Sequence, residues 1–245
     1  MMLLETNKLI KKYSGRTVVN EVCISIEQRS IVGLLGRNGA GKTTTFRMVI
    51  GMIVPDGGSV VFENSNISKL PMFKRARLGI GYLSQEPSVF QRLTVRENLQ
   101  AILETMSITK KQRNHRANML IERFGLTEVV NSQARVLSGG ERRKLEIARA
   151  MVTNPSLILL DEPFSGVDPI AVEELQHEIR RLVASGVSIL ITDHNVERTL
   201  EVSDKAYIMD HGKVIAAGTP KQIIQNELVK KSYLGSTFKG DEFDE

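Results

Sequence analysis

Short apolar runs alternate along the chain with segments in which apolar residues recur at helical spacing. The runs lie at residues 30–36, 157–160, 187–192 and 205–209, and each ends at or beside a glycine or an aspartate. Their length and composition are those of buried β-strands. Helical spacing occurs at residues 42–50, across much of 94–153, and at 169–184. Strands that alternate with helices predict an α/β fold with a mostly parallel core sheet.

Capping signals mark the helices in the middle of the chain. Thr94 and Glu97 have the spacing of a capping box, which opens a predicted helix that ends near residue 106. A second helix is expected at 109–124. Residues from about 86 to 153 are therefore interpreted as a helical subdomain inserted into the core.

Turn signals predict antiparallel β-structure at both ends of the chain. A proline-glycine turn leads into a strand at 59–63, and an Asp-His-Gly turn joins the fourth apolar run to a strand at 213–217. A helix is expected from Thr219 onward. We expect one domain at 1–238, with an antiparallel β-subdomain, followed by an acidic tail at 239–245.

The composition is that of an ordinary globular protein. Of 245 residues, 41% are hydrophobic and 25% are charged, which excludes a disordered chain and a small disulfide scaffold. The net charge of +5 suits a phosphate ligand or a membrane surface. Without a block of basic residues it does not indicate nucleic acid, and we expect no nucleic acid partner.

Two further observations concern cysteine and the membrane. The single cysteine, Cys23, lies in an apolar alternation and is expected to pack as a small hydrophobic residue. No signal peptide is recognised, and no apolar run is long enough to span a membrane. Contact with a membrane is therefore expected only through partner proteins.

Residues 36–43 read Gly-Arg-Asn-Gly-Ala-Gly-Lys-Thr, which matches the phosphate-loop pattern in full. The segment follows a predicted strand and opens a predicted helix, whose N-terminus favours an anion. Lys42 can reach the β- and γ-phosphates of a nucleotide, and the Thr43 hydroxyl can bind Mg²⁺. The candidate nucleotide contacts are Arg37, Asn38, Gly39, Ala40, Gly41, Lys42, Thr43 and Thr44.

Two acidic residues follow the second apolar run. Asp161 and Glu162 stand at the end of a predicted buried strand. Beside a phosphate loop, Asp161 is expected to hold Mg²⁺, and Glu162 is expected to orient and polarise an attacking water molecule.

A Leu-Ser-Gly-Gly-Glu segment precedes these acids in the chain. Ser138 and Glu141 have the spacing of a capping box for the next helix. A cap does not require the two glycines between them, Gly139 and Gly140, which instead suit close approach of the backbone to a ligand. Both interpretations can hold together.

The order of these motifs, with Gln85 and His194, resembles that of the nucleotide-binding subunits of ABC transporters. The resemblance covers nearly the whole chain. It implies the P-loop NTPase fold of that family and hydrolysis of ATP in the presence of Mg²⁺. In this family Tyr13 would stack on adenine, Gln85 and His194 would sense the γ-phosphate, and Asp168 would cross to a partner subunit. The implied catalytic residues are Lys42, Gln85, Glu162 and His194, and the implied metal ligands are Thr43, Gln85 and Asp161.

The resemblance also implies a dimer. In the family, the segment that holds Ser138, Gly139 and Gly140 faces the ATP that the other subunit binds. Only one phosphate loop is present in this chain, so a second chain would be required, and a homodimer is the simplest expectation.

Longer segments narrow the resemblance to the ATPases of lipopolysaccharide export systems. They lie at 33–46, 75–86, 161–170, 191–196, 218–220 and 233–235, with Phe238. Two transmembrane permease subunits would be contacted near Phe90, and the protein would lie on the cytoplasmic face of the inner membrane. Gln91 stands where that subfamily would have an arginine.

Two alternatives stay open at this point. The ATPase of a branched-chain amino acid importer shares the compact single-cassette plan. A soluble ABC ATPase without transport is a second possibility, although the coiled coils usual in repair-type members do not fit in 245 residues. Phe90 also has a simpler interpretation, as a core residue.

Overall fold

The computed structural model describes residues 1–166 and 168–234, with the backbone alone at 232 and 234. Its core is a six-stranded sheet in the order β11-β10-β4-β9-β8-β7. The parallel strands are β4 (Ile31–Gly36), β7 (Ile80–Leu83), β8 (Leu157–Asp161), β9 (Ser188–Thr192) and β10 (Lys205–Asp210), and β11 (Lys213–Gly218) is antiparallel to β10. The predicted α/β class with a mostly parallel core sheet is confirmed.

The strand register brings the carboxyl ends of the parallel strands to one edge of the sheet. Gly36 at the end of β4 pairs with Met209 of β10, and Asp161 at the end of β8 pairs with Thr192 of β9. In sheets of this kind ligands bind outside the carboxyl ends of the strands. The loops that carry the predicted site residues leave from this edge.

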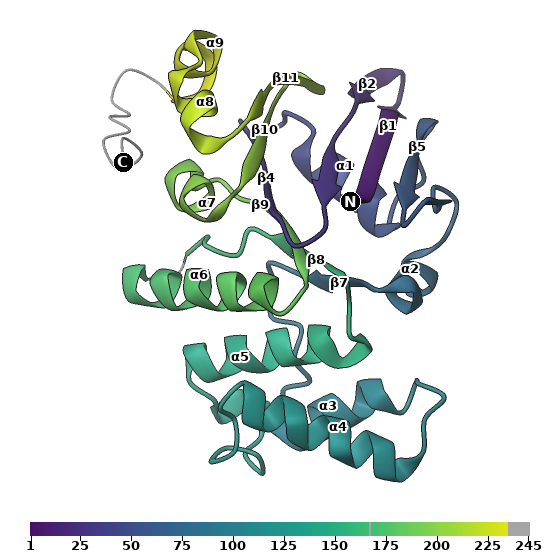
Figure 1. Cartoon of the computed structure of the whole chain (residues 1–245), viewed down its shortest axis with the longest axis vertical. Helices are drawn as coiled ribbons and strands as arrows, with labels where there is room; N and C mark the ends of the chain where they lie inside the picture. The colour runs from purple at the N-terminus through teal and green to yellow at the C-terminus, as the bar shows by residue number, and fades with distance from the viewer. Residues whose placement is uncertain (167, 235–245) are drawn as a thin grey trace.

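An antiparallel sheet lies beside the core sheet, on its right in Figure 1. Its strands are β1 (Met2–Tyr13), β2 (Arg16–Val22), β3 (Ser25–Glu27), β5 (Gly57–Phe62) and β6 (Ser65–Asn66). The order is β2-β1-β5-β6, with β3 paired to β1. This sheet is the predicted antiparallel β-subdomain.

Helices surround the core sheet and form a separate layer below it (Figure 1). Around the core are α1 (Lys42–Ile50), α2 (Met72–Leu78), α6 (Pro169–Ala184), α7 (Val196–Val202), α8 (Pro220–Gln225), α9 (Glu227–Val229) and the π-helical turn η3 (Lys230–Leu234). The lower layer holds α3 (Val95–Leu103), α4 (Lys110–Arg123) and α5 (Gly139–Ala150), with the 3₁₀ turns η1 (Ala134–Val136) and η2 (Met151–Thr153).

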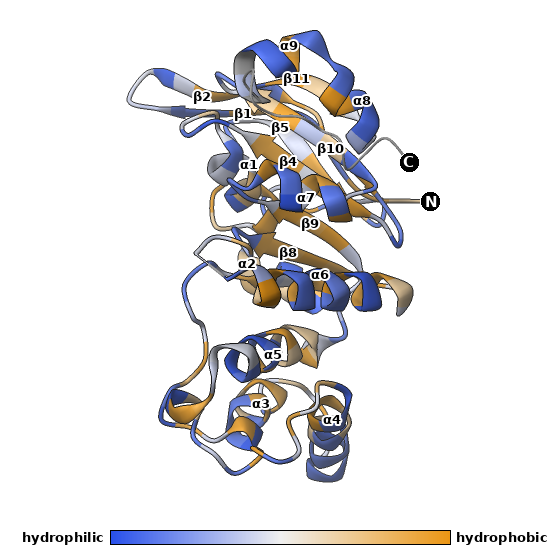
Figure 2. Cartoon of the chain, turned by 90° about the vertical axis from the view of Figure 1, so that its left-hand side faces the viewer, coloured by the Kyte–Doolittle hydropathy of each residue, from blue (hydrophilic) through white to orange (hydrophobic). Residues whose placement is uncertain are grey.

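Two large hydrophobic cores lie on the two faces of the core sheet. The side chains of β8 alternate between them, as expected for a strand buried on both faces. Leu157 and Leu159 pack in the core shared with α1 and the antiparallel sheet, whereas Ile158 and Leu160 pack in the core shared with α6 and the lower helices. Figure 2 shows apolar residues concentrated on the core strands and hydrophilic ones on the outer side of α4.

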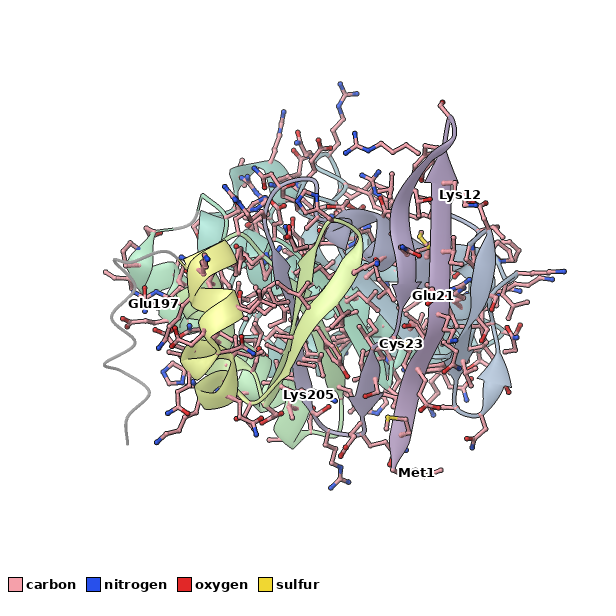
Figure 3. The ribbon with its side chains drawn as sticks, turned by 90° about the horizontal axis from the view of Figure 1, so that it is seen from above. Met1, Lys12, Glu21, Cys23, Glu197 and Lys205 are labelled. Atoms are coloured by element: carbon pink, nitrogen blue, oxygen red, sulfur yellow. The ribbon has the colours of Figure 1, made fainter. Side chains whose placement is uncertain are left out.

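The prediction that Cys23 is buried is wrong. The residue is exposed, and its Sγ accepts a hydrogen bond from the Lys8 N–H at 3.2 Å. Glu21 has a positive φ of 54°, which interrupts the strand alternation just before Cys23. Figure 3 shows both residues on the antiparallel sheet, far from Glu197 of α7.

Some predicted boundaries also differ from the structure. The helix capped by Thr94 ends at Leu103 rather than near residue 106. The helix that begins after Thr219 stops at Gln225, because the Asn226 side chain caps a new turn by accepting the Leu228 and Val229 N–H groups at 2.9 and 3.2 Å. The elements α2, β7 and α7 were not predicted. Phe238 and the tail at 239–245 lie outside the described residues.

Candidate functional site

The phosphate loop between β4 and α1 has a backbone that requires glycine at two positions. Gly36 has a φ of 152°, and a Cβ atom there would lie 2.2 Å from the Met209 carbonyl oxygen. Gly41 has a φ of 99°, and a Cβ atom there would lie 2.7 Å from the Val18 carbonyl oxygen. The loop is therefore packed directly against β10 and β2, where no other residue type fits.

Lys42 is buried at the start of α1, and its ammonium group points back into the loop. Nζ donates to the carbonyl oxygens of Gly36 at 2.6 Å and Arg37 at 3.2 Å. Burial lowers the pKa of Lys42, and the charges of Glu162 and Asp193 oppose that shift. The ammonium group thus lies inside the loop that would surround a phosphate.

The N-terminus of α1 is open to an anion. Thr43 is exposed and Thr44 is half-buried in the first turn, which contains no acidic residue. The free N–H groups and the positive end of the helix dipole therefore favour negative charge there. Of the other predicted contacts, Arg37, Asn38 and Gly39 are exposed, and Ala40 and Gly41 are buried.

Glu162 follows β8 and meets two other predicted site residues. His194 Nε2 lies 2.6 Å from Oε1 of this carboxylate, and Gln85 Nε2 donates to Oε2 at 2.8 Å. Glu162 has a positive φ of 48°, and its N–H donates to the Thr192 carbonyl at 2.7 Å. Such strained conformations cluster at functional sites. Three loops thus converge on one carboxylate, both of whose oxygens have partners.

Asp161 is held by a residue that the sequence analysis missed. The Tyr82 hydroxyl donates to Asp161 Oδ2 at 3.2 Å. Burial raises the pKa of Asp161, and the hydrogen bond from Tyr82 and the charge of Arg47 act in the opposite direction. Burial also raises the pKa of Tyr82 to about 12, so its hydroxyl remains a donor. A tyrosine within an apolar stretch three positions before Gln85 was the available signal.

Asp193 was also missed, although it stands at the end of a predicted strand. Its side chain is fully buried. Oδ2 accepts the Phe164 N–H at 2.8 Å, and Oδ1 accepts the Asn195 N–H at 2.8 Å. Asp193 therefore ties the segment after Glu162 to the turn that carries His194.

The Ser138 capping box forms as predicted. The Ser138 hydroxyl accepts the Glu141 N–H at 3.2 Å, and the Ser138 N–H donates to the Glu141 carboxylate at 2.8 Å. Hydrogen bonds from Ser138 lower the pKa of Glu141. A Cβ atom at Gly139 would meet nothing within 4 Å, and one at Gly140 would lie 4.0 Å from Glu174. Nothing within the described chain therefore requires glycine at these two positions.

A cavity of about 690 Å³ lies between α5 and α6. Its lining includes the predicted site residues Gln85, Gly139, Gly140, Glu162 and Asp168. Asp168 also caps α6, since its Oδ1 accepts the Ala171 N–H at 3.0 Å. Glu162, Gln85 and His194 are called the Glu162 cluster below. The cavity therefore connects this cluster with the N-terminus of α5.

Tyr13 and Phe90 are both exposed. Tyr13 ends β1 and is 44% exposed, with Lys11 Nζ 5.5 Å from the centre of its ring. Phe90 is 48% exposed, so its interpretation as a core residue is not supported. The Arg149 guanidinium carbon lies 4.6 Å from the centre of the Phe90 ring. Each aromatic ring is thus available to a ligand or partner.

Comparison with known proteins places this geometry in a family. A family model described as ABC transporter matches residues 19–165. The lipopolysaccharide export system ATP-binding protein LptB of Haemophilus influenzae is 51% identical over 240 residues, which cover 98% of this chain and 100% of that protein. The protein of the same name from Escherichia coli is 50% identical with the same coverage.

Solved structures with the same fold are also ATP-binding cassettes of ABC transporters. The ADP conformation of MJ1267, an ATP-binding cassette of an ABC transporter, has a TM-score of 0.86 and 27% identity, and the match covers 96% of this chain and 99% of that one. A nucleotide-free ATP-binding cassette from an ABC transporter has a TM-score of 0.85 and 27% identity, with 96% and 100% coverage. Together with the phosphate loop and the Glu162 cluster, these matches establish that the chain belongs to the ABC transporter family, as an ATP-hydrolysing subunit.

Proposed function

We propose that this chain powers lipopolysaccharide export, as a homodimer bound to two membrane permease subunits. The observation that carries the proposal is the identity of about half of all residues, across 98% of the chain, to proteins named for that export system. The protein would lie on the cytoplasmic face of the inner membrane. Among the described residues no helix is both long and apolar enough to cross a bilayer, so its membrane contact would depend on the permeases.

The phosphate loop would bind the triphosphate of ATP. Lys42 Nζ, which donates to two loop carbonyl groups, would turn to the β- and γ-phosphates, where opposite charge strengthens the hydrogen bonds. Tyr13 would stack on the adenine ring. The nucleotide-binding cassette would comprise residues 1–238, with the helical subdomain at about 86–153.

The donor set around Asp161 fits Mg²⁺, which prefers oxygen ligands and keeps several of its waters. Thr43 supplies an exposed hydroxyl at the start of α1, and Asp161 supplies a carboxylate whose Oδ2 is already oriented by Tyr82. Gln85 would supply an amide oxygen. The ion would neutralise charge that develops on the transferred phosphoryl group.

Glu162 would act on the attacking water. Its carboxylate is held between His194 and Gln85, so release from either partner would free an oxygen to accept a proton from water. His194 would then hydrogen-bond the γ-phosphate. Asp193 holds the segment after Glu162 and the turn that carries His194. Glu162 and His194 would therefore keep their positions relative to each other.

A second copy of the chain would complete the site. Gly139 and Gly140 are exposed and have no steric reason within the described chain to be glycine. Close approach of a phosphate from another subunit would supply that reason. Asp168, on the same cavity, would cross to the partner.

The substitution Ser138→Arg tests whether two chains together form the nucleotide site, which is called the composite site here. ATP binding to the phosphate loop should persist, because Ser138 belongs to a different segment. Turnover should fall about 100-fold, because a clash of about 3 kcal/mol at the dimer interface raises the barrier by that factor. Phosphate release and binding of a fluorescent ATP analogue measure the two effects. Ser107→Arg, at an exposed serine, is the control, and normal turnover of Ser138→Arg would argue against the composite site.

The permease contact would lie at Phe90. Asn98, fully buried, fixes the backbone of this residue by accepting its N–H at 2.8 Å and donating to its carbonyl at 3.0 Å. Arg149 packs on the ring and also donates to the Ser88 carbonyl. A rigidly held, exposed aromatic ring is the kind of residue that dominates binding at interfaces. Residues 90–92 would form a groove for the permease, with Gln91 inside it.

Replacing Phe90 with alanine should weaken binding to the permease without slowing ATP hydrolysis. We expect the isolated chain to hydrolyse ATP within about twofold of the wild type, whereas permease affinity should fall about 30-fold, the effect of a 2 kcal/mol contact. Co-purification from membranes measures the affinity. Met119→Ala is the control, because it removes an exposed apolar side chain at a different place, on α4. This variant should retain the permeases. Equal retention by both variants would remove Phe90 from the interface.

Identification of the membrane partners tests the proposal as a whole. Tagged Glu162→Gln protein would be purified from detergent-solubilised membranes, and its partners would be identified by mass spectrometry. Two membrane subunits accompanied by lipopolysaccharide would support the proposal. Amino acid permease subunits would replace it with an importer, and the absence of any membrane protein would replace it with a soluble ATPase.

A further inference from the structure

The ammonium group of Lys11 is held in place by the loop between α1 and β5. Nζ donates to the Val54 carbonyl oxygen at 2.9 Å and to Asp56 Oδ1 at 2.8 Å. Only 15% of the Lys11 side chain is exposed. A lysine on a surface normally samples many side-chain conformations, whereas these two acceptors and the burial hold Lys11 in one position.

Asp56 is attached to β1 at two further points. Its Oδ2 accepts the Lys12 N–H at 2.7 Å, and its own N–H donates to the Ile10 carbonyl oxygen at 2.8 Å. Hydrogen bonds from Lys11 and Lys12 lower the pKa of Asp56, so the carboxylate is charged at neutral pH. The loop after α1 is therefore attached to the last residues of β1 through both side-chain and backbone groups.

The same ammonium group lies over the ring of Tyr13, the last residue of β1. Nζ is 5.5 Å from the centre of the ring, within the distance of about 6 Å at which a cation is attracted to an aromatic face. The ring is 44% exposed. Because Lys11 occupies one face of the ring, a flat group that stacks on Tyr13 has to use the other face.

Tyr13 stands at a position where an aromatic ring would otherwise be free to turn. It pairs with Arg16 across the turn at residues 14–15, at the end of the hairpin of β1 and β2. A side chain that becomes ordered only on binding weakens the binding, whereas a side chain that is already ordered does not carry this cost. Contact with a fixed cation orders the ring before a ligand arrives.

We propose that Lys11 is a positioning residue for the base of the nucleotide, which fixes the Tyr13 ring and leaves one face of it free for stacking. The loop that holds Lys11 directly follows α1, whose N-terminus borders the phosphate loop. The base and the triphosphate would thus be bound by connected parts of the chain. The inference rests on the proposed stacking of Tyr13 on adenine.

The substitution Lys11→Met in the full chain tests the inference, because methionine retains an unbranched side chain without the charge. Affinity for ATP should fall about fivefold, the effect of losing the cation–π contact and the order that it gives the ring, whereas affinity for inorganic triphosphate, which has no base, should stay within about twofold of the wild type. Titration with an ATP analogue that is fluorescently labelled on the ribose, in the presence of Mg²⁺, measures the first quantity. Competition by inorganic triphosphate measures the second. An equal fall in both affinities would overturn the inference.

Removal of the ring shows whether Lys11 acts through Tyr13. Tyr13→Leu should itself lower ATP affinity about tenfold, the effect of one lost stacking contact with a base. In the Tyr13→Leu background, the further substitution Lys11→Met should have no additional effect, since the group that Lys11 positions is gone. A full fivefold loss in that background would overturn the inference.

Two more variants control for charge and for folding. Lys12→Met removes the same charge from the next residue, whose side chain is exposed, and should leave ATP affinity unchanged. Lys11→Arg keeps a cation that can bond to Asp56 and cover the ring, so it should bind ATP within about twofold of the wild type. If Lys12→Met weakened ATP binding as much as Lys11→Met, loss of charge alone would explain the effect and the inference would fail.

Failure of the proposed function gives a different result. If the wild-type chain bound no ATP analogue, the proposed function itself would fail. If the wild type and Tyr13→Leu bound the analogue equally well, ATP binding would stand, but stacking on Tyr13 would be excluded and the role of Lys11 with it.

Discussion

Glu162→Gln should bind ATP with near wild-type affinity and hydrolyse it about 10²- to 10⁴-fold more slowly, the usual contribution of a general base. Glutamine preserves the length of the side chain, so contact with Gln85 and His194 remains possible. The variant lacks the negative charge that, in the proposed mechanism, polarises the attacking water. Because ATP would not be consumed, the variant should accumulate as a nucleotide-bound dimer.

Three measurements on the purified full chain check this expectation. Phosphate release gives the turnover, a fluorescent ATP analogue gives the affinity, and size-exclusion chromatography with ATP gives the oligomeric state. Glu128→Gln, which neutralises an exposed carboxylate in the lower helical layer, should behave as the wild type. Wild-type turnover in Glu162→Gln would remove Glu162 from the base role.

Arg75→Met should lower the free energy of unfolding by about 3–5 kcal/mol, because it leaves several buried carbonyl groups without a donor. Arg75 is 1% exposed. Its guanidinium donates to the carbonyl oxygens of Met48 and Val49 at 2.7 Å each, Leu70 at 2.9 Å and Ser68 at 3.0 Å. Burial lowers the pKa of Arg75 to about 10, so the group stays charged at neutral pH and suits the C-terminus of α1.

Denaturant unfolding measures the effect, and a fall in melting temperature of about 10 °C is expected for a chain of this size. Arg77→Met provides the control on the same helix, since Arg77 is exposed and its replacement should change stability by less than about 0.5 kcal/mol. If the two variants lost equal stability, Arg75 would not anchor the end of α1.

The parts of the site that could be predicted from the sequence are those set by neighbours in the chain. The Ser138 capping box depends on residues within one turn of each other, and the phosphate loop is one continuous segment between a strand and a helix; both have the expected form. The same reasoning failed at Cys23, where one positive φ at Glu21 reversed the direction of the side chain. A pattern of alternation cannot reveal such a break, because Glu21 is an ordinary strand residue in every other respect.

Contacts between distant segments were harder to predict. Gln85 and Glu162 meet because β7 and β8 pair in parallel, and the sequence suggested this meeting only through the family resemblance. The hydrogen bond from Tyr82 to Asp161 and the two bonds to Asp193 span sheet strands or loops. In the sequence, Tyr82 and Asp193 look like ordinary strand and turn residues. Only the strand order shows which distant residues they meet.

The two hydrogen-bonding partners of the Glu162 carboxylate affect how fast the protein would hydrolyse ATP in the absence of cargo. A water molecule that approaches this carboxylate must share an oxygen with Gln85 or His194, or displace one of them. Losing one hydrogen bond to a charged group costs about 1.5–3 kcal/mol, which slows a reaction about 10- to 150-fold. Gln85 lies just before the lower helical layer, so a movement of that layer would remove the restraint. If the proposed permease contact forms, turnover without cargo would stay low until the permease shifts those helices.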